Sequence, residues 1–343
     1  MSAGWSVAIL GATGAVGRTM LETLADSPIA VRELRLLATP RGAGRTMTFR
    51  GNEISVTAVT PESFAGVELA LFSAGAAASE TWAPIAVRAG AWVIDNSSRF
   101  RMDPEVALIV PEVNPHRIPD EPAIIANPNC STIQMVVALA PLHARFGLAE
   151  VFVATYQSAS GAGGKGLQAL ETELAGGAVE PGSYRFPRRL AGNVIPQCDV
   201  FLSDGYTREE EKMVHETQKI LDLPELPVHP TCVRVPVPVA HSEAIYLRLG
   251  SAVNLESARI ALQAAPGVRL LDDPGAGEYP TADLAAGTDP VWVGRLRADR
   301  YDPRGLHLWV VSDNLRKGAA LNAVQIACLL WDRRSADLTR SLP

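Results

Sequence analysis

Apolar and polar positions alternate in two different ways along the chain, and the change falls near Val151. Before that point, continuous apolar runs are separated by segments with helical spacing. The predicted strands are SVAILGA, ELRLLAT, ISVTAVT, VELALFSAG, AWVIDNS and PAIIANP, and the predicted helices are RTMLETLAD and TWAPIAVRAG. Continuously apolar strands that alternate with helices are typical of a parallel sheet covered on both faces.

After Val151 the strands tend to alternate polar and apolar residues. The predicted strands are VFVATYQSASG, VRVPVPVA, SEAIYLRLG and HLWVVSD, and the predicted helices are REEEKMVHETQKIL and ESARIALQAA. This pattern favours a half-exposed sheet that is antiparallel or mixed. The last segment, LRKGAALNAVQIACLLWDRR, predicts a long amphipathic helix that packs back on the first domain.

Length and composition are those of an ordinary globular protein. The chain has 343 residues, of which 47% are hydrophobic and 20% charged, enough for about two domains of roughly 150 residues each. No apolar run approaches the ~18 residues that a membrane helix needs, and the start MSAGWSVAILGATG lacks the basic region of a signal peptide. We therefore expect a cytoplasmic protein. The net charge of −6 and the lack of a basic stripe argue against nucleic-acid binding.

Four cysteines, Cys130, Cys198, Cys232 and Cys328, lie far apart in the sequence. They form no CxxC pair and no close cluster with histidine, so we expect no metal site. In a reducing compartment these thiols should be free rather than paired in disulfides.

The motif GATGAVG, from Gly11 to Gly17, follows the first predicted strand and precedes the first predicted helix. Glycines in this setting allow a tight turn and let a phosphate approach the N–H groups at the helix N-terminus, although a plain tight turn is the alternative. After the second strand, LRLLATPRGAGR offers Thr39, Arg41 and Arg45 where NAD enzymes usually have a carboxylate. A guanidinium there suits a 2′-phosphate, unless Arg41 is only a solvated loop charge. We predict NADP(H).

Cys130 lies between a Pro-Asn turn and an apolar segment with helical spacing, in ANPNCSTIQMVVALA. Asparagine is a favoured N-cap and Pro128 stops the helix from extending backwards, so Cys130 is predicted in or beside the first turn. There the helix dipole and unpaired N–H groups lower a thiol pKa and can bind an oxyanion. The alternative is an inert core cysteine, which is the role we expect for the other three.

A nucleophilic cysteine needs a base, and His241 is the strongest of the six histidines. It is predicted to end the apolar strand of RVPVPVAHSEA, directly before polar residues. Arg234 lies on the same extended segment, where a guanidinium can bind a carboxylate in bidentate fashion or simply face solvent. Glu209 and Lys212 are three positions apart on one predicted helix, so they share a face, as a routine surface ion pair also does.

The motifs GATGAVG, NPNCST, YQSASGAG, TREEEKM, RVPV…HSEA and DNLRKGAALNAVQIA follow one another over nearly the whole chain. In this order they resemble the aspartate-β-semialdehyde dehydrogenase family. The resemblance implies an α/β fold with an N-terminal Rossmann-type NADP-binding domain, residues 1–129 plus 314–343. It also implies a second, α+β domain for catalysis and dimerisation, residues 130–313, and a homodimer.

The family reaction is the NADPH-dependent reductive dephosphorylation of L-aspartyl-4-phosphate to L-aspartate-4-semialdehyde, on the route to lysine, threonine, methionine and diaminopimelate. By resemblance, Cys130 forms a thioester with the acyl group, His241 shuttles the proton and Gln157 orients the substrate. The implied substrate-binding residues are Asn129 and Gln157, together with Arg101 and Lys212 for the phosphate, Glu209 for the ammonium group and Arg234 for the α-carboxylate. The implied cofactor-binding residues are Gly11, Thr13, Gly14, Ala15, Val16, Arg41, Gly42, Ser160, Gly161 and Asn314.

Two positions depart from the family pattern. Ala240 precedes His241 where many relatives have glycine, which is expected to restrict the local backbone. Arg99 stands where a small or aromatic residue is common, close to Arg101 in the sequence, and adds positive potential near the phosphate pocket.

Three alternative functions share parts of this pattern. N-acetyl-γ-glutamyl-phosphate reductase uses the same chemistry, but an acetylated nitrogen gives Glu209 no ammonium group to bind. Glyceraldehyde-3-phosphate dehydrogenase is usually NAD-linked, which the missing carboxylate after the second strand disfavours. A non-catalytic paralogue would be expected to have lost Cys130 or His241, and both are present.

Overall fold

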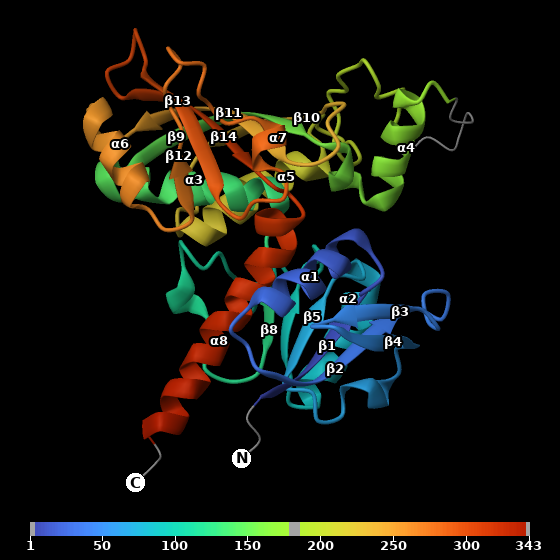
Figure 1. Cartoon of the computed structure of the whole chain (residues 1–343). Helices are drawn as coiled ribbons and strands as arrows, with labels where there is room; N and C mark the ends of the chain where they lie inside the picture. The colour runs from blue at the N-terminus through green and yellow to red at the C-terminus, as the bar shows by residue number, and fades with distance from the viewer. Residues whose placement is uncertain (1–3, 178–185, 341–343) are drawn as a thin grey trace. The chain divides into compact units, whose positions relative to one another are not determined.

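The chain divides into two compact units in the computed structural model, which describes residues 4–177 and 186–340 (Figure 1). The first unit contains Met1–Pro128 and Ala319–Pro343, and the second contains Asn129–Gly318. Each unit is built on its own sheet.

The sheet of the first unit has eight strands in the order β3-β4-β2-β1-β5-β6-β8-β7. All neighbouring strands are parallel except β3 and β4, which confirms the parallel sheet predicted for this region. The strands are β1 (Trp5–Leu10), β2 (Val31–Ala38), β3 (Thr46–Phe49), β4 (Asn52–Ala58), β5 (Leu69–Phe72), β6 (Trp92–Asp95), β7 (Ala107–Leu108) and β8 (Ile124–Ala126). The strand order reverses between β1 and β5, so the crevice at their carboxyl ends is where such sheets bind ligands.

Both faces of this sheet are buried, which explains why its strands are continuously apolar. The helices are α1 (Ala15–Asp26), α2 (Ala76–Arg88) and α8 (Leu321–Arg340), with short helical turns η1 (Pro61–Phe64) and η2 (Pro115–Arg117). Val7 and Ile9 of β1 belong to the core formed with α1 and α8, whereas Ala8 and Leu10 belong to the core formed with α2.

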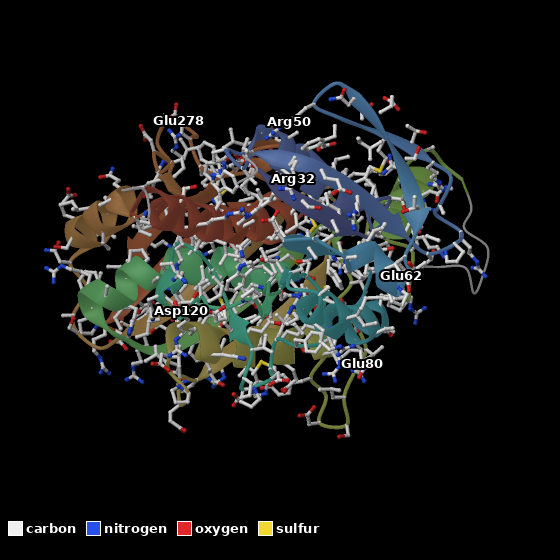
Figure 2. The ribbon with its side chains drawn as sticks, turned by 90° about the horizontal axis from the view of Figure 1, so that it is seen from below. Arg32, Arg50, Glu62, Glu80, Asp120 and Glu278 are labelled. Atoms are coloured by element: carbon white, nitrogen blue, oxygen red, sulfur yellow. The ribbon has the colours of Figure 1, made fainter. Side chains whose placement is uncertain are left out.

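Arg50 closes the C-terminal end of α1. Its backbone is left-handed, with φ of 47°, and its guanidinium donates to the carbonyls of Leu24, Ala25, Ser27 and Ile29. The last carbonyls of a helix lack internal partners, so this side chain fixes the end of α1 (Figure 2 labels Arg50 beside the strands of the first unit).

The sheet of the second unit has six strands in the order β10-β9-β11-β14-β13-β12. It is mixed, as predicted, because the β9–β10 and β12–β13 pairs are parallel and the pairs between them are antiparallel. The strands are β9 (Leu148–Gln157), β10 (Val228–Arg234), β11 (His241–Leu249), β12 (Val268–Leu270), β13 (Val291–Ala298) and β14 (Gly305–Ser312). The helices are α3 (Cys130–Phe146), α4 (Gly164–Leu174), α5 (Arg208–Leu221), α6 (Leu255–Ala264) and α7 (Ala282–Ala285), with η3 (Ala159–Ala162) and, across the unit boundary, the π-helical turn η4 (Arg316–Ala320).

Helix α3 packs on one face of this sheet, with α5 beside it (Figure 1). On β11, His241, Glu243 and Ile245 are buried on that side. Tyr246 and its alternate neighbours face the opposite side, where the sheet surface is partly exposed. The face that packs on α3 is therefore part of the buried core, whereas the opposite face is a partly exposed surface.

One predicted strand has different bounds. The segment VRVPVPVA was expected to be a strand that His241 ends, but β10 ends at Arg234 and β11 begins at His241. Pro236 and Pro238 have no N–H to donate to a strand ladder, which is why the segment forms a connection instead. The expectation that His241 ends a strand is therefore wrong, because His241 is the first residue of the next strand, β11.

Candidate active site

The turn between β1 and α1 is shaped for a close ligand. Gly11 has a φ of 87°, and a Cβ there would overlap the carbonyl oxygen of Ser73, while one at Gly17 would overlap that of Gly11. Gly14 caps α1 without any side-chain hydrogen bond, so the amides of Ala15 and Val16 face an open helix N-terminus. This turn fits the pyrophosphate of a dinucleotide.

The loop after β2 lies against the same turn. A Cβ at Gly42 would lie 3.3 Å from Thr13 Oγ1 and 2.8 Å from Ala38 Cβ, so the predicted cofactor residues Thr13 and Gly42 are neighbours. Arg41 precedes Gly42 and is exposed. The loop after β2 is therefore suited to contact the adenosine ribose of a dinucleotide and the group on its 2′ position.

The two candidate phosphate arginines have different surroundings. Arg101 is buried, and its Nη2 donates to the Asn96 carbonyl at 2.9 Å. Arg99 is exposed and pairs with Glu80 at 3.0 Å, and Figure 2 shows Glu80 at the outer surface. The structure thus separates Arg101, which is held inside the first unit, from Arg99, which makes a surface ion pair.

Cys130 is the first residue of α3, as predicted, and it is half-buried. Asn129 is the N-cap, and its Oδ1 accepts from the amides of Ser131 at 2.9 Å and Thr132 at 3.3 Å. These two amides are therefore not the unpaired groups that we expected, and the helix dipole is what remains to stabilise a thiolate. A Cβ at Gly318 would lie 3.0 Å from Cys130 Cβ, so glycine is needed for this close approach.

Four of the predicted substrate residues form one hydrogen-bonded cluster. Glu209 Oε1 accepts from Asn129 Nδ2 at 2.9 Å and from Gln157 Nε2 at 3.1 Å. Glu209 Oε2 accepts from Lys212 Nζ at 3.0 Å, and Lys212 also donates to Asp199 at 2.8 Å. Burial would raise the pKa of Glu209, but Lys212 and the two amides lower it to about 2. The carboxylate is therefore ionised at neutral pH.

Gln157 ties this cluster to the helix that begins with the cysteine. Its Nε2 donates to Ser131 Oγ at 2.5 Å, and its Oε1 is buried without a partner among the described residues. Ser131 is a site residue that the sequence reasoning missed, although its position next to Cys130 was a signal that could have found it.

Arg234 and His241 meet at Gly161. A Cβ on Gly161 would lie 2.9 Å from both Arg234 Nη1 and His241 Nε2, and Arg234 Nη1 donates to the Ser158 carbonyl at 2.6 Å. His241 is fully buried. Burial and the Arg234 charge lower the pKa of His241 to about 3, so its imidazole is neutral at physiological pH.

Ser160 and Asn314, both predicted to contact the cofactor, are buried and bonded to each other. Asn314 Oδ1 accepts from Ser160 Oγ at 3.1 Å, from Ser158 Oγ at 3.0 Å and from the Ala240 amide at 3.0 Å. Ala240 has a φ of 74°, a conformation that favours glycine. The backbone at Ala240, where a restriction was expected, therefore has a left-handed conformation, and its amide is hydrogen-bonded to Asn314.

Some of the charged residues of the site line a cavity of about 370 Å³ in the second unit. Its walls include Gly161, Glu209, Lys212 and Arg234, and the ring of Phe186 lies 5.8 Å from the Arg234 guanidinium. Cationic and anionic groups on one wall of a small cavity suit a substrate that bears both charges.

The remaining cysteines should not react with an alkylating agent at neutral pH. Burial raises the pKa of Cys198 to about 12, that of Cys232 well above its ordinary value, and that of Cys328, beside Asp332, to about 11. Because the thiolate is the nucleophile, iodoacetamide at pH 7 should modify Cys130 alone. Mass spectrometry of the digested native protein checks this, and early labelling of Cys198 or Cys232 would contradict it.

Two family models match the chain, in the same order as the two units. Residues 6–121 match the NAD-binding domain of semialdehyde dehydrogenases, and residues 139–317 match their dimerisation domain. The fold and the site therefore define a semialdehyde dehydrogenase, an oxidoreductase with an NAD-binding domain.

Similarity to individual relatives identifies the family within this class of enzymes. The aspartate-semialdehyde dehydrogenase of Aquifex aeolicus is 50% identical over 333 residues, which cover 95% of this chain and 98% of that protein. The crystal structure of aspartate semialdehyde dehydrogenase II from Vibrio cholerae complexed with ASA has a TM-score of 0.91 at 47% identity, covering 96% of this chain and 99% of that one. The enzyme from Candida albicans, solved with NADP, has a TM-score of 0.74 at 25% identity, covering 95% and 98%. The chain belongs to the aspartate-semialdehyde dehydrogenase family, and the resemblance and the fold class expected from the sequence are confirmed.

No helix within residues 4–177 and 186–340 is both long and apolar enough to cross a bilayer. Over the same residues, no group of three or more His, Cys, Asp or Glu side chains is arranged to hold a metal ion.

Proposed function

We propose that the protein reduces L-aspartyl-4-phosphate to L-aspartate-4-semialdehyde with release of phosphate, through a thioester on Cys130. The observation that supports this most is the Asn129–Glu209–Gln157 cluster at the start of the helix that Cys130 begins. It places an ionised carboxylate near a thiol at a helix N-terminus, which suits an amino-acid substrate with a reactive acyl group.

Each end of the substrate has a charged partner in this proposal. Glu209 binds the ammonium group and Arg234 binds the α-carboxylate as a bidentate partner, while Gln157 orients the acyl group beside Cys130. Lys212 and Arg101 bind the phosphate. His241 acts as the general acid and base that shuttles the proton. Covalent catalysis replaces one difficult displacement with two easier steps.

NADP(H) is the proposed cofactor, and when bound it supplies the hydride that reduces the thioester. The residues that fit it are Gly11, Thr13, Gly14, Ala15 and Val16 at the β1–α1 turn, Arg41 and Gly42 after β2, and Ser160, Gly161 and Asn314 of the second unit. Arg41, exposed at the end of β2, suits the 2′-phosphate that distinguishes NADP from NAD. A clear preference for NADH in binding measurements would refute this choice.

The reverse reaction tests the assignment directly. Aspartate semialdehyde, NADP and phosphate should produce NADPH, which is followed by its absorbance. Turnover only with N-acetylglutamate semialdehyde would transfer the assignment to the acylated substrate. We do not expect this result, because Glu209 is proposed to bind a free ammonium group, which the acylated substrate lacks. Lack of turnover with both aldehydes, in a protein that still binds NADPH, would favour a non-catalytic paralogue.

Lys212→Ala should raise KM for phosphate in this assay by about tenfold, which corresponds to the loss of one charge-assisted contact of ~1.4 kcal/mol. Because Lys212 also neutralises the buried Glu209 carboxylate, the free energy of unfolding of the variant is measured alongside its kinetics. KM for phosphate and KM for the aldehyde are measured in parallel. An equal rise in both would contradict the role given to Lys212.

We also propose that the protein is a homodimer that uses the outer face of the six-stranded sheet. A groove of about 770 Å³ lies on this face, and the aromatic residues Phe152, Tyr156 and Tyr279 are 40%, 37% and 42% exposed. Exposed aromatic surface of this kind marks an interface, and it belongs to the region that matches a dimerisation domain. Sedimentation of Tyr246→Glu, which puts a charge in the groove, should show a shift toward monomer.

A further inference from the structure

Glu216 is a buried acid of α5 to which the proposed reaction gives no part. It is 1% exposed, and its Oε2 accepts the backbone N–H of Asn129 at 2.6 Å. An acidic side chain is seldom buried unless hydrogen bonds satisfy it. The hydrogen bond of Glu216 is made to the residue that directly precedes Cys130, so it connects α5 to the start of α3.

All four polar groups of Asn129 form hydrogen bonds. Its carbonyl oxygen accepts from the Ile133 amide at 2.9 Å, which is the first backbone bond of α3, and its Oδ1 accepts from the amides of the second and third residues of that helix. Its Nδ2 donates to Glu209, and its backbone N–H donates to Glu216. The two acceptors of Asn129 therefore bond to α3, and its two donors bond to α5.

The backbone N–H of Asn129 finds its acceptor outside its own helix. In a capping box, the N–H of the N-cap residue donates to a glutamate or glutamine side chain three positions later in the same helix. Helix α5 begins in this way, because Glu210 Oε2 accepts from the Thr207 amide at 2.7 Å. The third residue of α3 is Thr132, and the acceptor for Asn129 comes instead from α5, 87 positions later in the chain. The start of α3 therefore depends on Glu216.

Glu216 shares a face of α5 with two residues that are proposed to bind the substrate. Glu209, Lys212 and Glu216 are spaced by three and four positions, which brings their side chains to one side of a helix. Helix α3 packs against α5. One rigid helix thus carries the groups for the ammonium and the phosphate of the substrate and, through Asn129, holds the start of the helix with the nucleophile.

We propose that Glu216 is a positioning residue of the active site, which fixes Asn129 as the N-cap of α3 and thereby places Cys130 relative to the substrate. This role rests on the proposed function, because Cys130 is the nucleophile of that reaction. Glu216 does not line the cavity that contains Glu209 and Lys212, so it acts through Asn129 and not on the substrate itself.

Removal of the acceptor has a definite consequence for Cys130. The Asn129 N–H would be buried without a partner, which costs about as much free energy as a lost hydrogen bond. Rotation of the Asn129 backbone toward another acceptor relieves this cost, but it also moves Cys130 and draws Oδ1 away from the amides that it caps. A misplacement on the order of 1 Å slows an enzymatic reaction by about 100-fold. The loss should therefore appear in kcat, whereas KM depends on Glu209 and Lys212, which remain on α5.

Hydrogen exchange tests the contact without any substrate. Glu216→Met keeps the length of the side chain and removes the acceptor, whereas Glu216→Gln keeps an acceptor oxygen. In peptic peptides that contain residues 129–133, the amides capped by Asn129 should exchange at least about tenfold faster in Glu216→Met than in the unmodified protein. Glu216→Gln should keep the rates of the unmodified protein. Unchanged exchange in Glu216→Met would overturn the proposal, whether or not the proposed reaction is the right one.

The kinetics of the reverse reaction test the placement of Cys130. The kcat of Glu216→Met should fall by at least about tenfold, with KM for the aldehyde and for phosphate within about threefold of the unmodified protein. Glu216→Gln should restore most of kcat. A rise in KM at constant kcat would make Glu216 a substrate-binding residue and overturn the proposal. If the unmodified protein turns over neither aldehyde, the proposed function fails, and the exchange rates still decide whether Glu216 fixes the cap.

Glu216→Gln also decides the outcome if Glu216→Met does not fold. A folded Glu216→Gln with fast exchange at the capped amides or with a low kcat would show that the charge matters instead of the acceptor, and would overturn the proposal. Glu211→Met is the matched control on the same helix, because Glu211 is partly exposed and pairs with His215 at 2.8 Å. It should keep the exchange rates and kcat of the unmodified protein. A loss of kcat equal to that of Glu216→Met would assign the effect to α5 as a whole and overturn the role of Glu216.

Discussion

Replacing Cys130 with alanine should reduce turnover to the detection limit, a loss on the order of 10⁴-fold or more. The expected size follows from covalent catalysis, in which the sulfur forms the bond to the acyl group and no other side chain can take its place. The neighbouring thiols cannot substitute, since burial raises the pKa of both Cys198 and Cys232 far above neutrality. The rate is measured from NADPH absorbance in the reverse reaction.

Two controls keep this result from being read as a folding defect. NADPH binding by Cys130→Ala, followed by fluorescence titration, should stay near that of the unmodified protein, because the β1–α1 turn belongs to the first unit and Cys130 to the second. Cys328→Ala removes a thiol of α8 that packs on the core of the first unit, and it should retain turnover. A substantial rate in Cys130→Ala would show that the nucleophile is another residue.

Local rules were sufficient to predict the start of both key helices. The glycines of GATGAVG and the Asn-Pro-Asn before Cys130 act within one turn of the chain, so their effect can be read from the sequence. The shared face of Glu209 and Lys212 was predictable for the same reason, because spacing along one helix determines it. The structure confirms their contact at 3.0 Å.

The contacts around His241 and Gln157 depend on pairing between distant segments. Gln157 meets Ser131 across 26 positions, and Ser158 meets His241 across 83. No periodicity within a window predicts which strand lies beside which, so the contacts of Ser131 and Ser158 became visible only with the sheet register. The end of β10 was misplaced, because an apolar run with two prolines still resembles a strand in composition.

Glu243 is a buried acid that the sequence analysis did not single out. In HSEAIYLRLG it lies two positions after His241, on the face that Ile245 and Leu247 also occupy, and an acid in such a row was a signal that could have found it. Its side chain is fully buried, and neither carboxylate oxygen has a hydrogen-bond partner among the described residues. Burial raises the pKa of Glu243 well above its ordinary value, although the nearby amide of Gln134 acts to lower it.

A raised pKa makes stability depend on pH with a definite sign. The unfolded chain releases the Glu243 proton near pH 4.3, whereas the folded chain retains it to a higher pH. The folded state is therefore favoured fully at low pH, and this contribution falls by about 1.4 kcal/mol for each pH unit between the unfolded and the folded pKa. Burial of a carboxyl group without a partner thus lowers stability at neutral pH.

Glu243→Gln should remove this loss, because an amide of nearly the same shape does not titrate. The advantage of the variant in free energy of unfolding should grow as pH rises from 5 toward 8, by about 1.4 kcal/mol per unit until the folded pKa is reached. Urea unfolding at fixed protein concentration, at pH 5, 6.5 and 8, measures it, and Glu256→Gln, exposed on α6, is the matched control that should show no such trend. A constant difference across the three pH values would mean that the folded chain ionises Glu243 as readily as the unfolded one does. The growth of the difference, rather than its size at one pH, separates the titration of Glu243 from any change in packing, because a packing difference between Gln and Glu is the same at every pH.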